Sequence, residues 1–105
     1  MDRLIKDVTN AMYAEYDRAK AIHGPSHASA HEAYAVMLEE RQEADVEAVN
    51  VKIALDYFWN ATKKNEDTIE YAQNVMGAAL VAAAEYIQVA AMAYKATIGY
   101  GEGKA

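Results

Sequence analysis

Carboxylate side chains recur in the middle of the chain at spacings that bring them to one side of a helix. Glu39, Glu40 and Glu43 lie close together, and Glu40 and Glu43 are three residues apart, about one helical turn. A later segment places Glu85 and Gln88 at the same spacing. Hard oxygen ligands suit Mg²⁺ or Mn²⁺, and protein-bound Mg²⁺ is commonly shared with substrate phosphates. Antiparallel packing of the two segments would create a cation site for phosphate esters or anhydrides, nucleotides in particular.

The segment that contains Glu85 is almost entirely apolar. Between Val75 and Tyr94, Glu85 and Gln88 are the only strongly polar side chains. Such a helix is either buried on all sides or lies in a membrane. A central Glu and many Ala residues argue against a membrane span, so we expect burial against other helices, partly from a second subunit. A buried carboxylate is protonated, paired or bound to a cation, so Glu85 either ties two helices together or binds a ligand.

The net charge of −6 is concentrated in one part of the 105-residue chain. Residues 29–50 contain six acidic residues and only one basic residue, Arg41. Like charges at this density repel each other, and a bound cation would relieve the repulsion. A solvated acidic helix face is the alternative interpretation, and it is the more common meaning of a charge run.

Composition narrows the class of protein. There is no Cys, which excludes a disulfide framework and a thiolate metal site. The acidic balance argues against binding to nucleic acid, which would require clustered Lys and Arg. The first six residues carry Asp2, Arg3 and Lys6 and contain no apolar stretch, so we expect no signal peptide and a cytoplasmic protein.

The residue types predict an all-α fold. Helix-forming residues dominate, and Gly and Pro occur only at 24–25, 77 and 99–103. We expect a single helical domain over residues 1–97, an antiparallel bundle of three to five helices completed by oligomerisation, with residues 98–105 as a flexible Gly-rich tail.

The helix boundaries follow from capping signals. A first helix should run from about Asp2 to Ala21 and stop at Gly24-Pro25, and Ser29 with Glu32 forms a capping box for the next. Residues 49–62 either continue that second helix, straight or after a kink, or form a short separate helix. A break at residues 63–67 precedes a third helix over residues 68–97, with Asn65 or Asp67 as its cap.

Two local strings resemble a known family. Residues 31–43, HEAYAVMLEERQE, are similar to the first metal-binding helix of the MazG-like all-α NTP pyrophosphohydrolases. Residues 84–93, AEYIQVAAMA, resemble the corresponding late helix in small phage and prophage members. The resemblance covers about residues 29–96. It implies an Mg²⁺-dependent enzyme, usually a dimer or tetramer, that converts a nucleoside triphosphate to the monophosphate and pyrophosphate.

The resemblance also implies site residues. The family uses ExxE on one helix and ExxD on a later one, so Glu40, Glu43 and Glu85 would bind the metal. Gln88 stands where the family has Asp, and this neutral ligand should weaken metal affinity. A second pattern, Glu70-x-x-Gln73, lies nearer to Glu43 in the sequence but in polar surroundings, and we prefer Glu85.

The remaining candidates serve the same chemistry. Glu39 would orient the attacking water or act as a base, Lys95 would contact phosphate oxygens, and Trp59 would stack on a nucleobase. Trp59 as a core residue and Lys95 as a solvated residue near a helix end are the structural alternatives. Two other functions stay open: a protein that binds or sequesters a nucleotide without cleaving it, and a purely structural helical oligomer.

Overall fold

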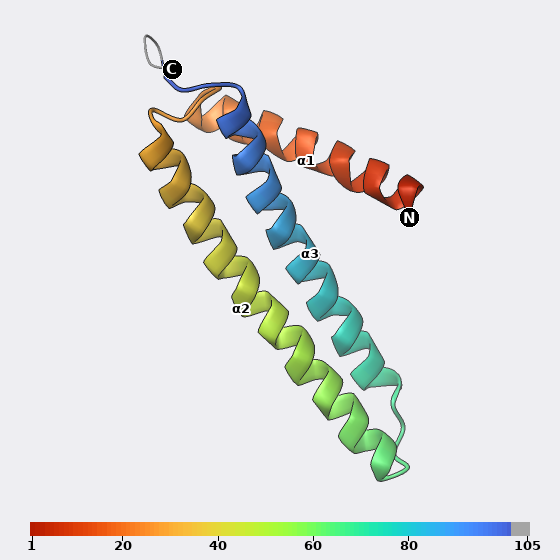
Figure 1. Cartoon of the computed structure of the whole chain (residues 1–105). Coiled ribbons are helices and arrows are strands. Elements are labelled where there is room, and N and C mark those ends of the chain that lie inside the picture. Colours follow the sequence, from red (N-terminus) through yellow and green to blue (C-terminus); the bar gives the residue numbers. More distant parts are fainter. Residues whose placement is uncertain (102–105) are drawn as a thin grey trace.

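The computed structural model describes residues 1–101 and contains three α-helices (Figure 1): α1 (Asp2–His23), α2 (Ala30–Lys63) and α3 (Ile69–Thr97). The all-α prediction is therefore confirmed. α1 extends two residues beyond the predicted end at Ala21, and Gly24, with a φ of 86°, follows it as the C-cap. α2 is one continuous helix of 34 residues, so residues 49–62 continue it without a separate element.

α2 and α3 form a long antiparallel hairpin (Figure 1). Alanine residues occupy its interior: Ala44 and Ala91 are fully buried, and Ala33, Ala61 and Ala82 are nearly so. Small side chains at these positions allow the two helix backbones to approach closely. Alanine packing thereby fixes which faces of α2 and α3 meet, and with them the positions of the polar side chains between the helices.

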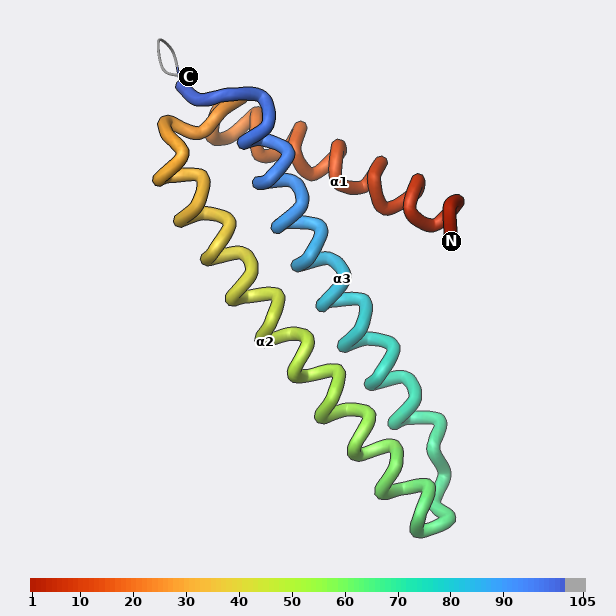
Figure 2. Tube along the Cα trace, viewed as in Figure 1, coloured from red at the N-terminus to blue at the C-terminus, as the bar shows by residue number. Residues whose placement is uncertain are grey.

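α1 leaves the hairpin at an angle (Figure 2) and packs against α3 alone among the helices. Tyr16 is its one buried residue, and it joins Ala91 and Met92 in the core. The rings of Tyr13 and Tyr16 both meet Tyr94 edge-on, each with ring centroids 5.1 Å apart. These contacts lie in the second half of α1, which is therefore the half that reaches α3.

The loop between α1 and α2 is fastened to the end of α3. Ser29 caps α2 as predicted, because its hydroxyl oxygen accepts from the backbone N–H of Glu32 at 3.1 Å. His27 is 1% exposed, and its Nε2 lies 3.1 Å from the backbone oxygen of Met92. Since a carbonyl oxygen can only accept, Nε2 carries the proton.

Two residues of the predicted tail, Tyr100 and Gly101, contact the loop between α1 and α2. The backbone N–H of Gly101 donates to the carbonyl oxygen of His27 at 2.7 Å, and Tyr100 forms an isolated β-bridge with His27. These two contacts attach Tyr100 and Gly101 to the α1–α2 loop. Residues 102–105 of the predicted tail lie outside the described residues.

Much apolar surface stays uncovered in the single chain, whose extents are 63 × 28 × 22 Å. In α3 only Ala82, Ala91, Met92 and Lys95 are buried, so the complete burial expected for residues 75–94 is not reached within the single chain. By length and composition alone, α3 also qualifies as a membrane-spanning helix, and only 17% of its apolar window is buried. Exposed large apolar side chains occur on all three helices and include Leu4, Ile5, Ile22, Val46, Val49, Ile53, Leu55, Tyr57, Trp59, Ile69, Met76 and Leu80.

Candidate metal and phosphate site

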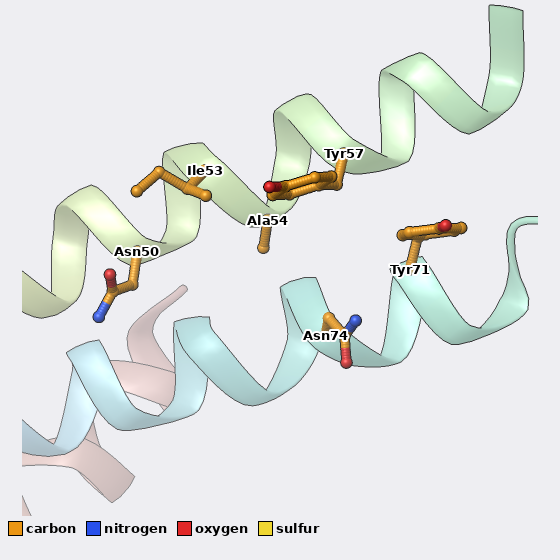
Figure 3. A pocket seen from close by; sticks show the side chains of 6 residues that line it. All are labelled: Asn50, Ile53, Ala54, Tyr57, Tyr71 and Asn74. Carbon is orange, nitrogen blue, oxygen red and sulfur yellow. The ribbon is translucent and has the colours of Figure 1, made fainter.

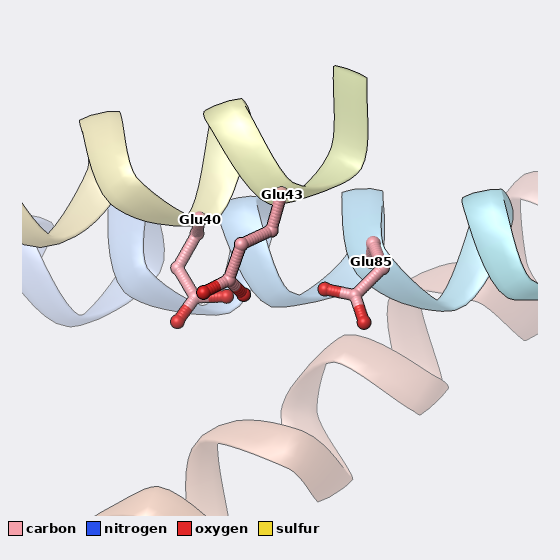
Figure 4. A group of neighbouring side chains, drawn as sticks. All are labelled: Glu40, Glu43 and Glu85. Carbon is pink, nitrogen blue, oxygen red and sulfur yellow. The ribbon is translucent and has the colours of Figure 1, made fainter. Parts of the chain in front are cut away.

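Three of the predicted carboxylates converge between α2 and α3 (Figure 4). Glu40 and Glu43 project from successive turns of α2, and the antiparallel α3 places Glu85 opposite them. Each offers one oxygen atom, and these three atoms all lie within 4.8 Å of one another. Glu40 and Glu85 are partly buried, whereas Glu43 is exposed. We call these three residues the carboxylate cluster.

The spacing of the carboxylate cluster suits a single small cation. Two oxygens bound to one Mg²⁺, each about 2.1 Å from it, are at most about 4.2 Å apart. Small side-chain rotations would therefore bring all three oxygens into coordination distance. Three hard oxygen ligands would leave about half of an octahedral shell for water or phosphate oxygens, which is the usual arrangement for Mg²⁺ at phosphate substrates.

The carboxylate cluster carries uncompensated negative charge. Among residues 1–101, none of its members forms an ion pair or a side-chain hydrogen bond. Partial burial, followed by the nearby charges of Glu43 and Glu85, raises the pKa of Glu40 above its ordinary value. A cation bound among the three carboxylates would remove this repulsion.

Other acidic residues of the same segment have local partners. Asp45 accepts a hydrogen bond from the hydroxyl of Tyr86 at 2.7 Å and pairs with Arg41 at 3.3 Å. This bond to the carboxylate also raises the pKa of the Tyr86 phenol. Glu47 accepts from Asn50 at 3.3 Å. Local pairing therefore accounts for these two residues, whereas the members of the carboxylate cluster have no such partner among residues 1–101.

A cavity of about 570 Å³ adjoins the carboxylate cluster and is lined from α1, α2, α3 and the α1–α2 loop. Lys95 lines it and is only 5% exposed, and within the described part of the chain it forms no ion pair within 4 Å and no side-chain hydrogen bond. A lysine that lines a cavity and has no acidic partner within 4 Å favours an anionic ligand there. The charged and polar lining residues are Glu15, Arg18, His23, His27, Glu32, Glu40, Gln88 and Lys95.

Gln88 and Glu39 lie beside the carboxylate cluster without belonging to it. Gln88 lines the cavity together with Glu40, and its amide nitrogen donates to Glu15 Oε1 at 2.8 Å. Glu39 is exposed beside Glu40 and is not a member of the carboxylate cluster. Its charge contributes to the raised pKa of Glu40.

Trp59 is not brought to the carboxylate cluster within one chain. It lies sixteen residues beyond Glu43 on the continuous α2, which corresponds to about 24 Å along the helix. Its side chain is 58% exposed, and Lys63 Nζ lies 5.7 Å from the ring centroid. A base stacked on Trp59 would therefore belong to a ligand held by a different copy of the chain.

The alternative pattern, Glu70-x-x-Gln73, lies at the N-terminal end of α3. Glu70 and Gln73 are exposed, and Glu70 is about 22 Å along α3 from Glu85. The structure thus brings Glu85, and not Glu70, together with Glu40 and Glu43.

The sequence interpretation missed Glu15 and Arg18, which α1 adds to the cavity. A usable signal was present, because Met12, Tyr16 and Ala19 share the face of α1 that packs on the core, and Glu15 lies on the same side. An acidic residue on the packed face of an amphipathic helix needs a partner.

A second cavity, of about 350 Å³, opens between α2 and α3 toward the loop that joins them (Figure 3). Tyr57 and Tyr71 line it from the two helices, with Ile53 and Ala54, and Asn50 and Asn74 add carboxamide groups. Trp59 is not part of this lining.

Comparison of the chain with protein families, with curated proteins and with solved structures found no match. The similarity to MazG-like enzymes therefore depends on the two strings around Glu40 and Glu85.

Proposed function

We propose that this protein is a divalent-cation-dependent nucleoside triphosphate pyrophosphohydrolase, which converts NTP and water to NMP and pyrophosphate. One observation carries the proposal: carboxylates from two separate helices converge within 4.8 Å beside a cavity that holds a nearly buried lysine. Cation ligands next to a cavity lined by Arg18 and Lys95 would suit a magnesium–triphosphate substrate.

Each group has a defined role in this reaction. Glu40, Glu43 and Glu85 would hold Mg²⁺ or Mn²⁺. The bound ion would supply charge neutralisation at the phosphoryl oxygens and acidify a coordinated water. Lys95 binds phosphate oxygens from the cavity. Glu39 accepts a proton from the attacking water, whose oxygen bonds to one of the two phosphorus atoms flanking the α–β bridge. The bridging bond to that phosphorus breaks, and its electron pair leaves with the departing phosphate group.

The uncovered apolar surface supports a homodimer or homotetramer as the working form. Large apolar side chains such as Ile53, Leu55 and Leu80 are exposed in the single chain, and further copies would cover them. A second copy would also be the source of any Trp59 that stacks on the base of a nucleotide bound at the carboxylate cluster.

Pyrophosphate release from a panel of canonical and modified nucleoside triphosphates, with Mg²⁺ or Mn²⁺, tests the proposal. We expect activity for the wild type and its loss in Glu43→Gln. Glu70→Gln serves as the matched control, because it removes the same charge from an exposed position and also tests the alternative acidic pattern. Equal inactivity of the wild type and Glu43→Gln across the whole panel would refute the enzyme function.

Gln88 favours one second candidate, a protein that binds a nucleotide without cleaving it. A neutral side chain at this position weakens the hold on the cation and so the power to stabilise the transition state. A nucleotide that raises the unfolding temperature in the presence of Mg²⁺, with no turnover, would select this function. A purely structural oligomer would show no Mg²⁺-dependent stabilisation.

A further inference from the structure

α1 reaches the candidate site through one chain of hydrogen bonds. Gln88 Nε2 on α3 donates to Glu15 Oε1 on α1 at 2.8 Å. Arg18 Nε, one turn further along α1, donates to Glu15 Oε2 at 2.9 Å. Both oxygens of Glu15 are therefore occupied, and its side chain is only 19% exposed. Glu15 is consequently not a free cation ligand but a partner that constrains Gln88.

The chemistry of this bond decides which way the Gln88 carboxamide points. An ionised carboxylate can only accept hydrogen bonds, so Gln88 must present its NH₂ group to Glu15. The carbonyl oxygen, which is the only atom of the carboxamide that ligates a hard cation, is left free. Gln88 lies one helical turn from Glu85 and shares its cavity with Glu40.

Lys95 supplies an observation that is independent of the acidic residues. Lys95 is 95% buried, lines the cavity beside Glu15 and Gln88, and has no acidic partner within 4 Å in the described part of the chain. Its charge is offset when an anion occupies the cavity. The site therefore combines a cation position at the carboxylate cluster with an anion position at Lys95.

We propose that Glu15 is a positioning residue that holds the Gln88 carboxamide with its oxygen toward the carboxylate cluster, so that Gln88 supplies a fourth oxygen ligand to the cation. This inference rests on the cation site of the proposed function. Partners that orient a metal ligand typically change metal affinity 10- to 100-fold when they are removed. Loss of the carboxylate at Glu15 should therefore weaken cation binding by at least about tenfold.

Mn²⁺ titration of the full-length protein without nucleotide, followed by the electron paramagnetic resonance signal of free Mn²⁺, measures this directly. Glu15→Gln can present its own NH₂ group to the Gln88 oxygen, which occupies the ligating atom, so we expect about tenfold weaker binding. Asp17→Asn is the matched control, because it removes the same charge from an exposed position on α1. We expect its Mn²⁺ affinity to stay within about twofold of wild type.

Exchanging the residues at positions 15 and 88, which we call the swapped pair, distinguishes a positioning role of Glu15 from a contribution to the stability of the fold. The double variant Glu15→Gln with Gln88→Glu keeps the net charge and the hydrogen bond, with donor and acceptor exchanged, and places a carboxylate at position 88. We expect Mn²⁺ affinity at least equal to wild type. Gln88→Met removes the oxygen while Glu15 stays in place, so it should weaken Mn²⁺ binding by the same factor as Glu15→Gln. It also provides the test should Glu15→Gln fail to fold.

The outcomes distinguish this inference from the function on which it rests. Wild-type affinity in Glu15→Gln or Gln88→Met, together with loss of Mn²⁺ binding in Glu43→Gln, overturns the role of Glu15 and leaves the cation site intact. A swapped pair that folds like wild type but does not recover Mn²⁺ affinity also overturns it. Absence of Mn²⁺ binding in the wild type refutes the cation site, and the role of Glu15 with it.

Discussion

Removing one carboxylate from the carboxylate cluster should stabilise the cation-free protein. At a separation of 4.8 Å, the upper limit within the carboxylate cluster, two unit charges repel by about 0.9 kcal/mol at the dielectric constant of water. Glu40→Gln removes two such pairs, and the site is partly open to solvent, so we expect the free energy of unfolding to rise by about 1–2 kcal/mol in low salt. For a domain of this size that corresponds to about 4–8 °C in the unfolding midpoint per kcal/mol.

The pH dependence has a defined sign. The pKa of Glu40 is raised in the folded state, so protonation favours folding. The wild type should therefore gain stability relative to Glu40→Gln as the pH falls through the folded pKa of Glu40. Above that pKa the carboxylate is charged, and the advantage of the variant is complete. Thermal unfolding of both proteins between pH 4 and 8, followed by circular dichroism, measures the difference.

Adding a divalent cation should make the wild type more stable than Glu40→Gln, which reverses their order in the cation-free state. A ligand at 100 times its dissociation constant adds about 2.7 kcal/mol to the free energy of unfolding. We expect wild type to be the less stable protein with chelator and the more stable one with saturating Mg²⁺. Glu70→Gln, which lies outside the carboxylate cluster, should follow wild type in both conditions. A Glu40→Gln protein that is less stable than wild type in chelator would refute the electrostatic reasoning, and a wild type indifferent to Mg²⁺ would refute the cation site.

Three further changes test the core, the loop and the surface. Met92→Ala removes a buried side chain packed with Tyr16 and should lower the free energy of unfolding by about 2–5 kcal/mol, measured by urea denaturation; a loss below about 1 kcal/mol would contradict its core position. His27→Ala removes the hydrogen bond to the backbone of Met92 and should cost about 1–3 kcal/mol in the same assay, whereas an unchanged midpoint would show that the bond contributes nothing. Leu80→Lys changes a side chain that is 64% exposed in the single chain, so it should weaken self-association in sedimentation velocity at little cost to helix content; unaltered association would place the interface elsewhere.

Local signals in the sequence were sufficient for the all-α class and for the grouping of Glu40, Glu43 and Glu85, but they left open whether residues 49–62 continue the second helix. Gly24 and Ser29 mark helix ends because their effects act within one turn. The cap predicted for the third helix was wrong, because Thr68, and neither Asn65 nor Asp67, is the N-cap of α3. Asp67 lies next to this boundary, and its side chain accepts from the backbone N–H of Ile69 at 3.0 Å. A regular helix keeps residues three apart on one side, so an antiparallel hairpin needs only the correct register to bring a second helix's carboxylate to them.

The contribution of α1 could not be predicted in the same way. The contact between Glu15 and Gln88 depends on the angle at which α1 crosses α3, where Tyr16 packs edge-on against Tyr94. The apolar stripe of α1 wrongly suggested burial of its first turns, because Leu4 and Ile5 are each 57% exposed. Periodicity predicts which residues of a helix lie on one side, but not whether a single subunit covers them.

Among the helices, α1 contacts only α3, and this has a consequence for the order in which the chain folds. The α2–α3 hairpin joins neighbours in sequence, so its contacts close early in folding, whereas α1 gains its tertiary contacts only by docking onto an α3 that is already formed. Backbone amides in the first turns of α1 should then exchange with solvent deuterium well before those around Ala44 and Ala91. The cavity beside Lys95 exists only while α1 is docked, which makes ligand access sensitive to the detachment of one helix.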